Sequence, residues 1–229
     1  MEPFEHLSNK AHQHLKICTD YTGHSLFNES TFPVLINEFQ ELQREYPIAL
    51  FRSAQTGRLS IHALTAFEEG VNSFIYDNKW RAQYIPLFVY CHPFSVTLSE
   101  SGTASLLVNP SHPAFEGGTE PLLHADGTLT TFTQSIMAAL EKIHHGQRET
   151  ADFIKFLEEH NLVREIAIEF ANQHTETVKK SGMLTVETRA FLSLPQDVQM
   201  EAVKKGFYAA MVLIEASLHG MRTLFNRNA

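Results

Sequence analysis

The sequence predicts an α+β fold, a single domain with a mainly antiparallel sheet and about five helices. Amphipathic helical segments are intermixed with short alternating strands, and strand–helix–strand units of regular length are absent. The composition suits a packed core, because 43% of the 229 residues are hydrophobic and 17 residues are Phe. We therefore expect one domain over residues 1–229, with a long C-terminal helix packed on the core.

Helices are expected where apolar residues recur every three or four positions. Residues 33–46 follow this pattern until Pro47 ends the helix. A later helix is expected to begin at a capping box that starts at Thr131 and to end before Gly146, and another covers residues 150–160. The C-terminal helix has the clearest stripe, formed by Phe207, Met211, Ile214, Leu218, Met221 and Phe225.

Strands are expected where apolar and polar residues alternate between turn-forming residues. The predicted strands pair residues 48–52 with 59–64, 94–98 with 104–108, and 163–170 with 183–188. A short helix is expected between Pro86 and Pro93. Residues 109–127 contain three prolines and three glycines, and they are the best candidate for an exposed functional loop.

The charge balance limits the classes of partner. The formal net charge is −8, and no dense cluster of Lys and Arg occurs, which argues against duplex nucleic acid or an anionic membrane as the main partner. The N-terminus is acidic and lacks a signal-peptide pattern, and the apolar run 207–214 is far shorter than the ~20 residues of a spanning helix. We therefore expect a soluble, cytoplasmic protein without an integral membrane segment.

One group of residues suggests ligand binding: Asn72, Trp80, Arg81, Tyr84 and Tyr90. Aromatic side chains next to an irregular segment provide a stacking surface, and Asn and Arg supply directional hydrogen bonds. In the alternative interpretation Trp80 fills the core and Asn72 stabilises a turn, because a single tryptophan in a domain of this size is usually structural.

A second group suggests a metal site. His124-Ala125-Asp126 fits the His-x-Asp arm of a two-histidine, one-carboxylate iron site, with His174 or His219 as the third ligand. The other interpretation of Asp126-Gly127 is a hairpin turn. No cofactor is predicted in that case, whereas the metal interpretation implies Fe(II).

No catalytic motif of high specificity occurs, so whether the chain is an enzyme stays open. A Gly-rich phosphate loop, a Walker motif and a Gly-x-Ser-x-Gly elbow are all missing from the sequence. The two cysteines, Cys18 and Cys91, cannot build a disulfide framework or a cysteine zinc site. Glu215 and His219 lie one turn apart on the last helix, where they form either an acid–base pair or an ion-paired flank.

Several motifs, taken in order and with their spacing, resemble the SapC-like family over nearly the whole chain. The motifs are Glu38-Phe39, Glu45-Tyr46-Pro47-Ile48, Gly70-Val71-Asn72-Ser73-Phe74, Trp80-x-x-x-Tyr84-Ile85-Pro86, Pro93-Phe94, Asp126-Gly127, Thr150-x-x-Phe153-x-x-x-Leu157-x-x-x-x-Leu162 and Leu194-Pro195. The family is bacterial and is named from a surface-layer locus. No catalytic residues come with its pattern.

The resemblance implies a soluble accessory or binding protein that acts with a partner protein or a small ligand in handling small molecules or surface material. The implied partner is a flavin-dependent halogenase-like protein or a second copy of the chain. Two alternatives stay open: an Fe(II) oxygenase that uses the His-x-Asp…His site, and a structural component of a surface layer.

Overall fold

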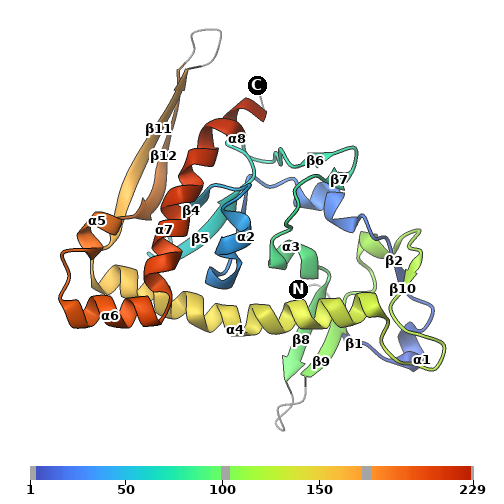
Figure 1. Cartoon of the computed structure of the whole chain (residues 1–229). Coiled ribbons are helices and arrows are strands. Elements are labelled where there is room, and N and C mark those ends of the chain that lie inside the picture. Colours follow the sequence, from blue (N-terminus) through green and yellow to red (C-terminus); the bar gives the residue numbers. More distant parts are fainter. Residues whose placement is uncertain (1–3, 99–103, 172–176, 228–229) are drawn as a thin grey trace. The chain divides into compact units, whose positions relative to one another are not determined.

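The computed structural model describes residues 4–98, 104–171 and 177–227 (Figure 1). The chain forms two compact units, and each unit combines segments that are far apart in the sequence. Unit 1 contains Met1–Phe27, Ile75–Arg81 and Leu87–His144, and unit 2 contains Asn28–Phe74, Ala82–Pro86 and His145–Ala229. The α+β class is confirmed, because the described chain mixes helices with sheets whose strand pairs are antiparallel. That residues 1–229 form a single domain stays a prediction.

The described residues of unit 1 form three small sheets. One has three strands in the order β1-β9-β8, and the others pair β10 with β2 and β6 with β7. The strands are β1 (Glu5–His6), β2 (Lys16–Ile17), β6 (Ile75–Tyr76), β7 (Lys79–Trp80), β8 (Phe94–Leu98), β9 (Ala104–Val108) and β10 (Glu120–Pro121). The helical elements are α1 (Asn9–His12), η1 (Tyr21–Gly23), η2 (Ser25–Phe27), α3 (Leu87–Cys91), η4 (Pro113–Phe115) and the first half of α4 (Thr131–Glu159).

The two hairpins of unit 1 differ in how well the sequence predicts them. The pairing of β8 with β9 is confirmed, since five alternating residues on each strand give a clear pattern. The turn between β6 and β7 lies at Asp77 and Asn78, which both have positive φ as a tight hairpin requires. The two-residue strands β6 and β7 are too short to give an alternating pattern, and the sequence does not predict them.

The segment 109–127 is less exposed than predicted. Asn109, His112, Ala114 and Leu122 are all buried, and β10 pairs with β2 within the segment. Its prolines and glycines therefore shape part of the interior of unit 1, although the tip at Asp126 is exposed.

Unit 2 is built on a five-stranded sheet in the order β11-β12-β4-β5-β3. The strands are β3 (Thr31–Pro33), β4 (Ile48–Arg52), β5 (Leu59–Leu64), β11 (Val163–Ala171) and β12 (Thr177–Val186). The helical elements are η3 (Ile36–Glu38), α2 (Phe39–Leu42), the second half of α4, α5 (Thr188–Phe191), α6 (Gln196–Lys204), α7 (Phe207–Ser217), η5 (Leu218–Gly220) and α8 (Met221–Arg227). The predicted strand over residues 183–188 begins earlier, at Thr177, and ends at Val186.

The predicted C-terminal helix is confirmed as α7, η5 and α8, which follow one another with a single 3₁₀ turn between them. Its stripe faces the core, where Met211, Ile214 and Met221 are buried. Ser217 fixes the helix to the sheet, because its hydroxyl accepts a 2.8 Å hydrogen bond from the backbone N–H of Ile48. Among the described helices, none is both long and apolar enough to cross a membrane.

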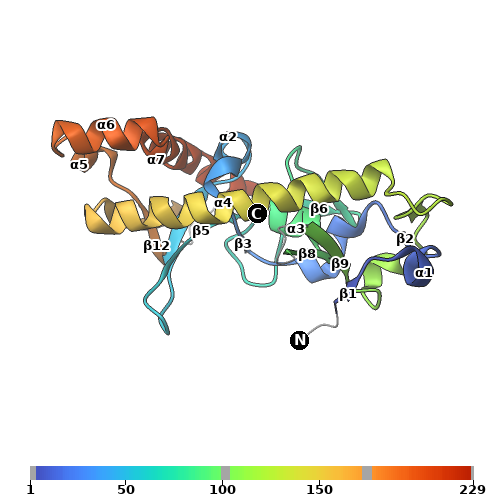
Figure 2. The same ribbon diagram turned by 90° about the horizontal axis from the view of Figure 1, so that it is seen from below.

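Helix α4 runs without a break from Thr131 to Glu159 (Figure 2), so the predicted end before Gly146 is wrong. Gly146 serves close packing here. A Cβ at this position would lie 2.7 Å from the side-chain atoms Nδ2 and Oδ1 of Asn37. The glycine is tolerated inside the helix because it lets the η3 segment approach the α4 backbone.

The start of α4 also differs from the prediction. The capping hydroxyl belongs to Thr130, one residue before the predicted cap Thr131. The Thr130 side chain accepts a hydrogen bond from the backbone N–H of Thr133 at 3.3 Å and donates to the carbonyl of Pro121 at 2.9 Å. Thr130 therefore caps the helix and joins it to the preceding loop of unit 1.

Candidate functional site

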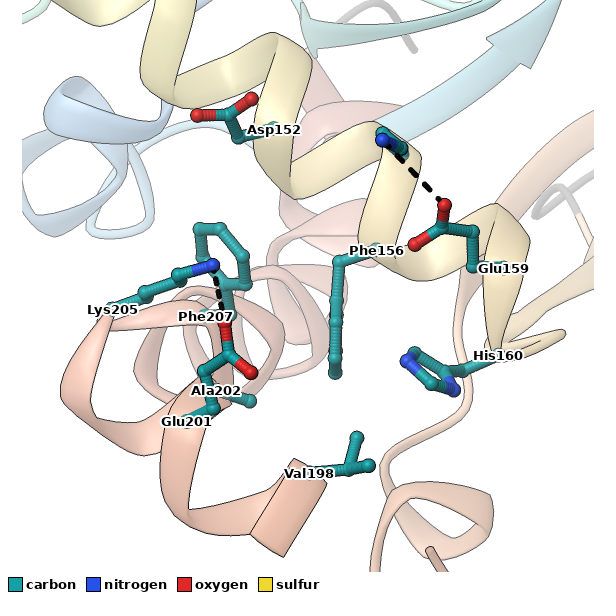
Figure 3. A pocket seen from close by; sticks show the side chains of 10 residues that line it. Asp152, Phe156, Glu159, His160, Val198, Glu201, Ala202, Lys205 and Phe207 are labelled. Atoms are coloured by element: carbon teal, nitrogen blue, oxygen red, sulfur yellow. Dashed lines mark ion pairs between the residues drawn. The ribbon is translucent and has the colours of Figure 1, made fainter.

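The main candidate site is a pocket in unit 2 that lies between the end of α4 and helix α6 (Figure 3). It encloses about 250 Å³. A second pocket, of about 510 Å³, lies against η3, α4 and α7 and shares Asp152, Lys205 and Phe207 with the first. We call the two adjoining pockets together the α4–α7 groove.

Helical spacing brings the lining residues of α4 to one side. Asp152, Phe156 and Glu159 recur at intervals of three or four residues and face the groove, whereas Phe153 and Leu157 are fully buried in the core. The same helix therefore packs on the sheet with one side and lines the groove with another.

A left-handed residue brings Phe207 into the groove. Helix α6 contributes Val198, Glu201 and Ala202 at helical spacing, and Gly206 follows with φ of 75°. This backbone conformation is readily available only to glycine, and it turns the chain sharply between α6 and α7. Phe207 then begins α7 and lines both pockets.

The floor of the groove is aromatic. The rings of Phe156 and Phe207 lie 5.4 Å apart between their centroids, and the imidazole of His160 lies 4.7 Å from the Phe156 ring. In Figure 3 the Phe156 ring projects into the middle of the pocket, with His160 at one side of it. Such a floor offers a flat organic ligand a contact surface that water wets poorly.

The rim of the groove is charged. Lys205 pairs with Glu201 at 2.6 Å and Lys155 pairs with Glu159 at 3.7 Å. The hydrogen bond between Lys205 and Glu201 lowers the pKa of the Glu201 carboxyl and raises the pKa of the Lys205 ammonium. Each of the two lysines thus lies next to a glutamate that is four residues away in the sequence.

The predicted ligand-binding residues belong to different units. Trp80, Arg81 and Tyr90 are part of unit 1. Trp80 is buried on β7, and Arg81 is exposed and lies 3.9 Å from the carboxylate of Asp77. The Tyr90 hydroxyl lies 3.2 Å from the hydroxyl of Ser135. The burial of Trp80 agrees with the structural interpretation.

Asn72 and Tyr84 are part of unit 2. Asn72 is buried, and its Oδ1 accepts a hydrogen bond from the backbone N–H of Phe74 at 3.0 Å, as the turn interpretation expects. None of the five predicted residues lines the α4–α7 groove. A binding role for Asn72, Trp80, Arg81, Tyr84 and Tyr90 stays a prediction.

Tyr84 takes part in a hydrogen-bond network with residues on either side of α2: Glu38 ends η3, and Glu45 and Tyr46 follow α2. Its hydroxyl donates to the buried carboxylate of Glu38 at 3.1 Å, and its backbone N–H donates to Glu45 at 3.2 Å. The Tyr46 hydroxyl donates to the Tyr84 carbonyl at 2.6 Å. These contacts, which we call the Tyr84 clamp, hold Tyr84 to η3 and to the residues that follow α2.

Of the residues predicted to bind iron, Asp126 forms hydrogen bonds within a turn. Asp126 accepts hydrogen bonds from the backbone N–H of Thr128 at 3.0 Å and from its hydroxyl at 2.6 Å, which lower the pKa of the Asp126 carboxyl. Gly127 has φ of +85°, so the turn expected at Asp126-Gly127 is present. His219 is exposed on unit 2, and His174 lies outside the described residues. Within the described ranges, no group of three His, Cys, Asp or Glu side chains could hold a metal ion.

Unit 1 has a separate pocket of about 510 Å³ beside η1 and η4. Its lining includes the exposed thiol of Cys18 and an ion pair between Asp20 and Lys79 at 3.2 Å. The pocket contains none of the five predicted ligand-binding residues.

The sequence model of the SapC family matches residues 7–224. The chain belongs to the SapC family. The match spans every element of the groove and of the Tyr84 clamp. No curated protein and no solved structure matched the chain in the other two comparisons.

The groove of this SapC protein could not be predicted from its sequence, because the lining residues come from separate segments and share no motif. Tyr84 belongs to the family motif Trp80-x-x-x-Tyr84-Ile85-Pro86, and the clamp gives this tyrosine a structural role. One wall shows a local pattern in the sequence, because Val198 and Ala202 are apolar residues four positions apart on α6.

Proposed function

We propose that this SapC protein is an accessory protein that binds a small organic ligand in the α4–α7 groove for use by a partner protein. The observation that carries the proposal is the aromatic floor of Phe156 and Phe207 beneath a charged rim. Small-molecule sites typically combine an apolar lining with a few polar groups that fix orientation.

Binding is favoured over catalysis by the chemistry of the lining. The residues of both pockets include no Ser, Thr, Cys or Tyr that could act as a nucleophile. The ion pair with Glu201 raises the pKa of Lys205, so its amine stays protonated at neutral pH and cannot attack a carbonyl group. The imidazole of His160 lies beside the Phe156 ring, and no hydroxyl or thiol among the lining residues is placed for it to activate.

The partner is proposed to be a protein that makes or uses the ligand. The family resemblance names a flavin-dependent halogenase-like protein or a second copy of the chain, and the groove leaves both open.

Ligand screening by NMR tests the binding site. Fragments that bind should shift the backbone amide signals of α6 and α7. Two substitutions, Val198→Trp in the first pocket and Ala209→Trp in the second, should abolish these shifts by filling the space. Ala216→Trp is the matched control, because Ala216 is exposed on α7 and lines neither pocket. A mixed fragment library that produces no shifts in these helices would overturn the proposal.

Metal analysis tests whether the protein is an iron-dependent oxygenase. We propose that the protein works without a bound metal, a view supported by the hydrogen bonds that engage Asp126 in its turn. Elemental analysis of protein purified without a histidine tag should find iron far below one equivalent. Stoichiometric iron that disappears in His124→Ala would contradict this.

A further inference from the structure

We infer that the α4–α7 groove selects an organic cation, namely a protonated amine with an apolar body, over anions and neutral molecules of the same shape. The inference rests on the proposed function and adds the chemical class of the ligand. It is carried by the excess of carboxylates over lysines in the groove together with its aromatic floor.

The groove has an excess of negative charge. Lys155 and Lys205 are each paired with a glutamate one turn away on the same helix. Two further carboxylates line the groove, Asp152 and Glu149, so that four carboxylates face two lysines there. In addition to the hydrogen bond with Glu201, the charge of Asp152 acts on Lys205 and helps to raise the pKa of its ammonium group. Asp152 lines both pockets, so its carboxylate is available to a ligand in either one.

Lys205 shows how this surface holds an ammonium group. Its Nζ lies 2.6 Å from a carboxylate oxygen of Glu201 and 5.8 Å from the centroid of the Phe207 ring. An ammonium group next to both a carboxylate and an aromatic face gains from each of them. A ligand ammonium near Asp152 would take the place of the Lys205 ammonium at the Phe207 ring, because Asp152, Lys205 and Phe207 line the same pockets.

The apolar part of the lining specifies the rest of the ligand. Phe156 and Val198 give the smaller pocket an apolar part beside its charged residues, and its volume of about 250 Å³ suits a single ring with a short chain. The net charge of −8 further favours approach of a cation and disfavours approach of an anion.

Three probes of matched shape test the charge preference: 2-phenylethylammonium, 2-phenylethanol and 3-phenylpropanoate. Each is titrated into the full-length protein at pH 7 and low ionic strength, and dissociation constants are taken from the amide shifts of α6 and α7. We expect the ammonium to bind about tenfold more tightly than the carboxylate, and added salt to narrow the difference.

Substitution of Asp152 identifies the carboxylate responsible. Asp152→Asn keeps the shape of the side chain and should weaken ammonium binding roughly five- to tenfold, with little effect on the alcohol. Glu165→Gln is the charge-matched control, because Glu165 is exposed on β11 outside the groove. It should leave the affinity of all three probes unchanged.

The outcomes separate the two proposals. If the alcohol or the carboxylate binds in the groove as tightly as the ammonium, or Asp152→Asn leaves ammonium binding unchanged, the charge preference is wrong while ligand binding in the groove stands. If none of the three probes shifts α6 and α7, the charge preference is overturned, and the fragment screen decides separately whether the groove binds any ligand.

Discussion

Glu38 and Tyr84 join two segments of unit 2 that are 46 positions apart in the sequence. The carboxylate of Glu38 is buried, with an exposed fraction of 1%, so each of its oxygens needs a hydrogen-bond donor. One oxygen accepts from the backbone N–H of Leu35 and the other from the Tyr84 hydroxyl. The clamp is thus part of the structural core, and Tyr84 is the member of it that the sequence predicted to bind a ligand.

Tyr84→Phe should lower the free energy of unfolding by about 1–3 kcal/mol, because it removes a donor from a buried carboxylate. Urea denaturation measures the change. Tyr208→Phe is the control, since Tyr208 is half-buried and stacks on Phe191 at 4.9 Å without a hydrogen bond from its hydroxyl to any described residue. Equal losses in the two variants would show that the hydroxyl of Tyr84 contributes nothing specific.

His62 makes the stability of unit 2 dependent on pH. Its ring nitrogens lie 3.3 Å from the Thr31 hydroxyl and 3.0 Å from the Ser60 hydroxyl, and burial lowers its pKa below the ordinary value of 6.5. Below pH 6.5 the unfolded chain therefore binds a proton more readily than the folded chain, and stability falls as the pH falls. Above that pH both states are neutral at this position.

We expect the free energy of unfolding to fall between pH 7.5 and pH 5.5, and to fall less in His62→Gln. The other histidines are common to both proteins, so their contributions cancel in the comparison. Denaturation curves at several pH values measure the difference. Identical pH dependence in the two proteins would mean that His62 titrates normally in the folded state.

At the scale of elements, local patterns predict structure well where they are long enough. The hairpin of β4 and β5 was predicted with its bounds, because alternating residues flank a turn in which Gly57 takes positive φ. The continuity of α4 could not be predicted in this way. A glycine inside a helical pattern usually signals its end, and only the approach of Asn37 explains Gly146.

Substitutions of two neighbouring residues, Thr130 and Thr131, test which of them caps the start of α4. Thr130→Ala should lower stability by about 1–2 kcal/mol, because it removes the cap and the bond to the Pro121 carbonyl. Thr131→Ala should change it by less than about 0.5 kcal/mol, since Thr131 is exposed. Thermal unfolding of the two variants compares them directly. A larger loss of stability in Thr131→Ala than in Thr130→Ala would show that Thr131 is the cap, as the sequence predicted.

At the scale of the whole molecule, the groove could not be predicted because its walls are distant in the sequence. Asp152 and Phe156 come from α4, whereas Lys205 and Phe207 lie about fifty positions later. Each is an ordinary residue of an amphipathic helix when seen locally. The family resemblance also gave no indication of the groove, because the family motifs lie in the clamp and in several turns. The membership of the chain in the SapC family was predictable for the opposite reason, since motifs along its whole length contribute to it.

The path of the chain through the two units has a consequence for folding. The backbone passes between the units at residues 27/28, 74/75, 81/82, 86/87 and 144/145. A single cut after Gly127, in the exposed turn, would divide both units between two fragments. In unit 2 it would separate β4 from β12, which pair at Leu50 and Leu184, and Phe39 from Phe153.

We therefore expect neither fragment 1–127 nor fragment 128–229 to fold alone, and expect the two to assemble into a native-like complex when refolded together. Each fragment by itself would expose apolar surface that the other covers in the intact chain. Dispersion of the amide signals in NMR spectra measures folding in each sample. Fragment 128–229 with Ile214→Asp should fail to assemble, because Ile214 is fully buried. Native-like dispersion of fragment 128–229 alone would show that the second half of the chain is an independent folding unit, contrary to a single domain over residues 1–229.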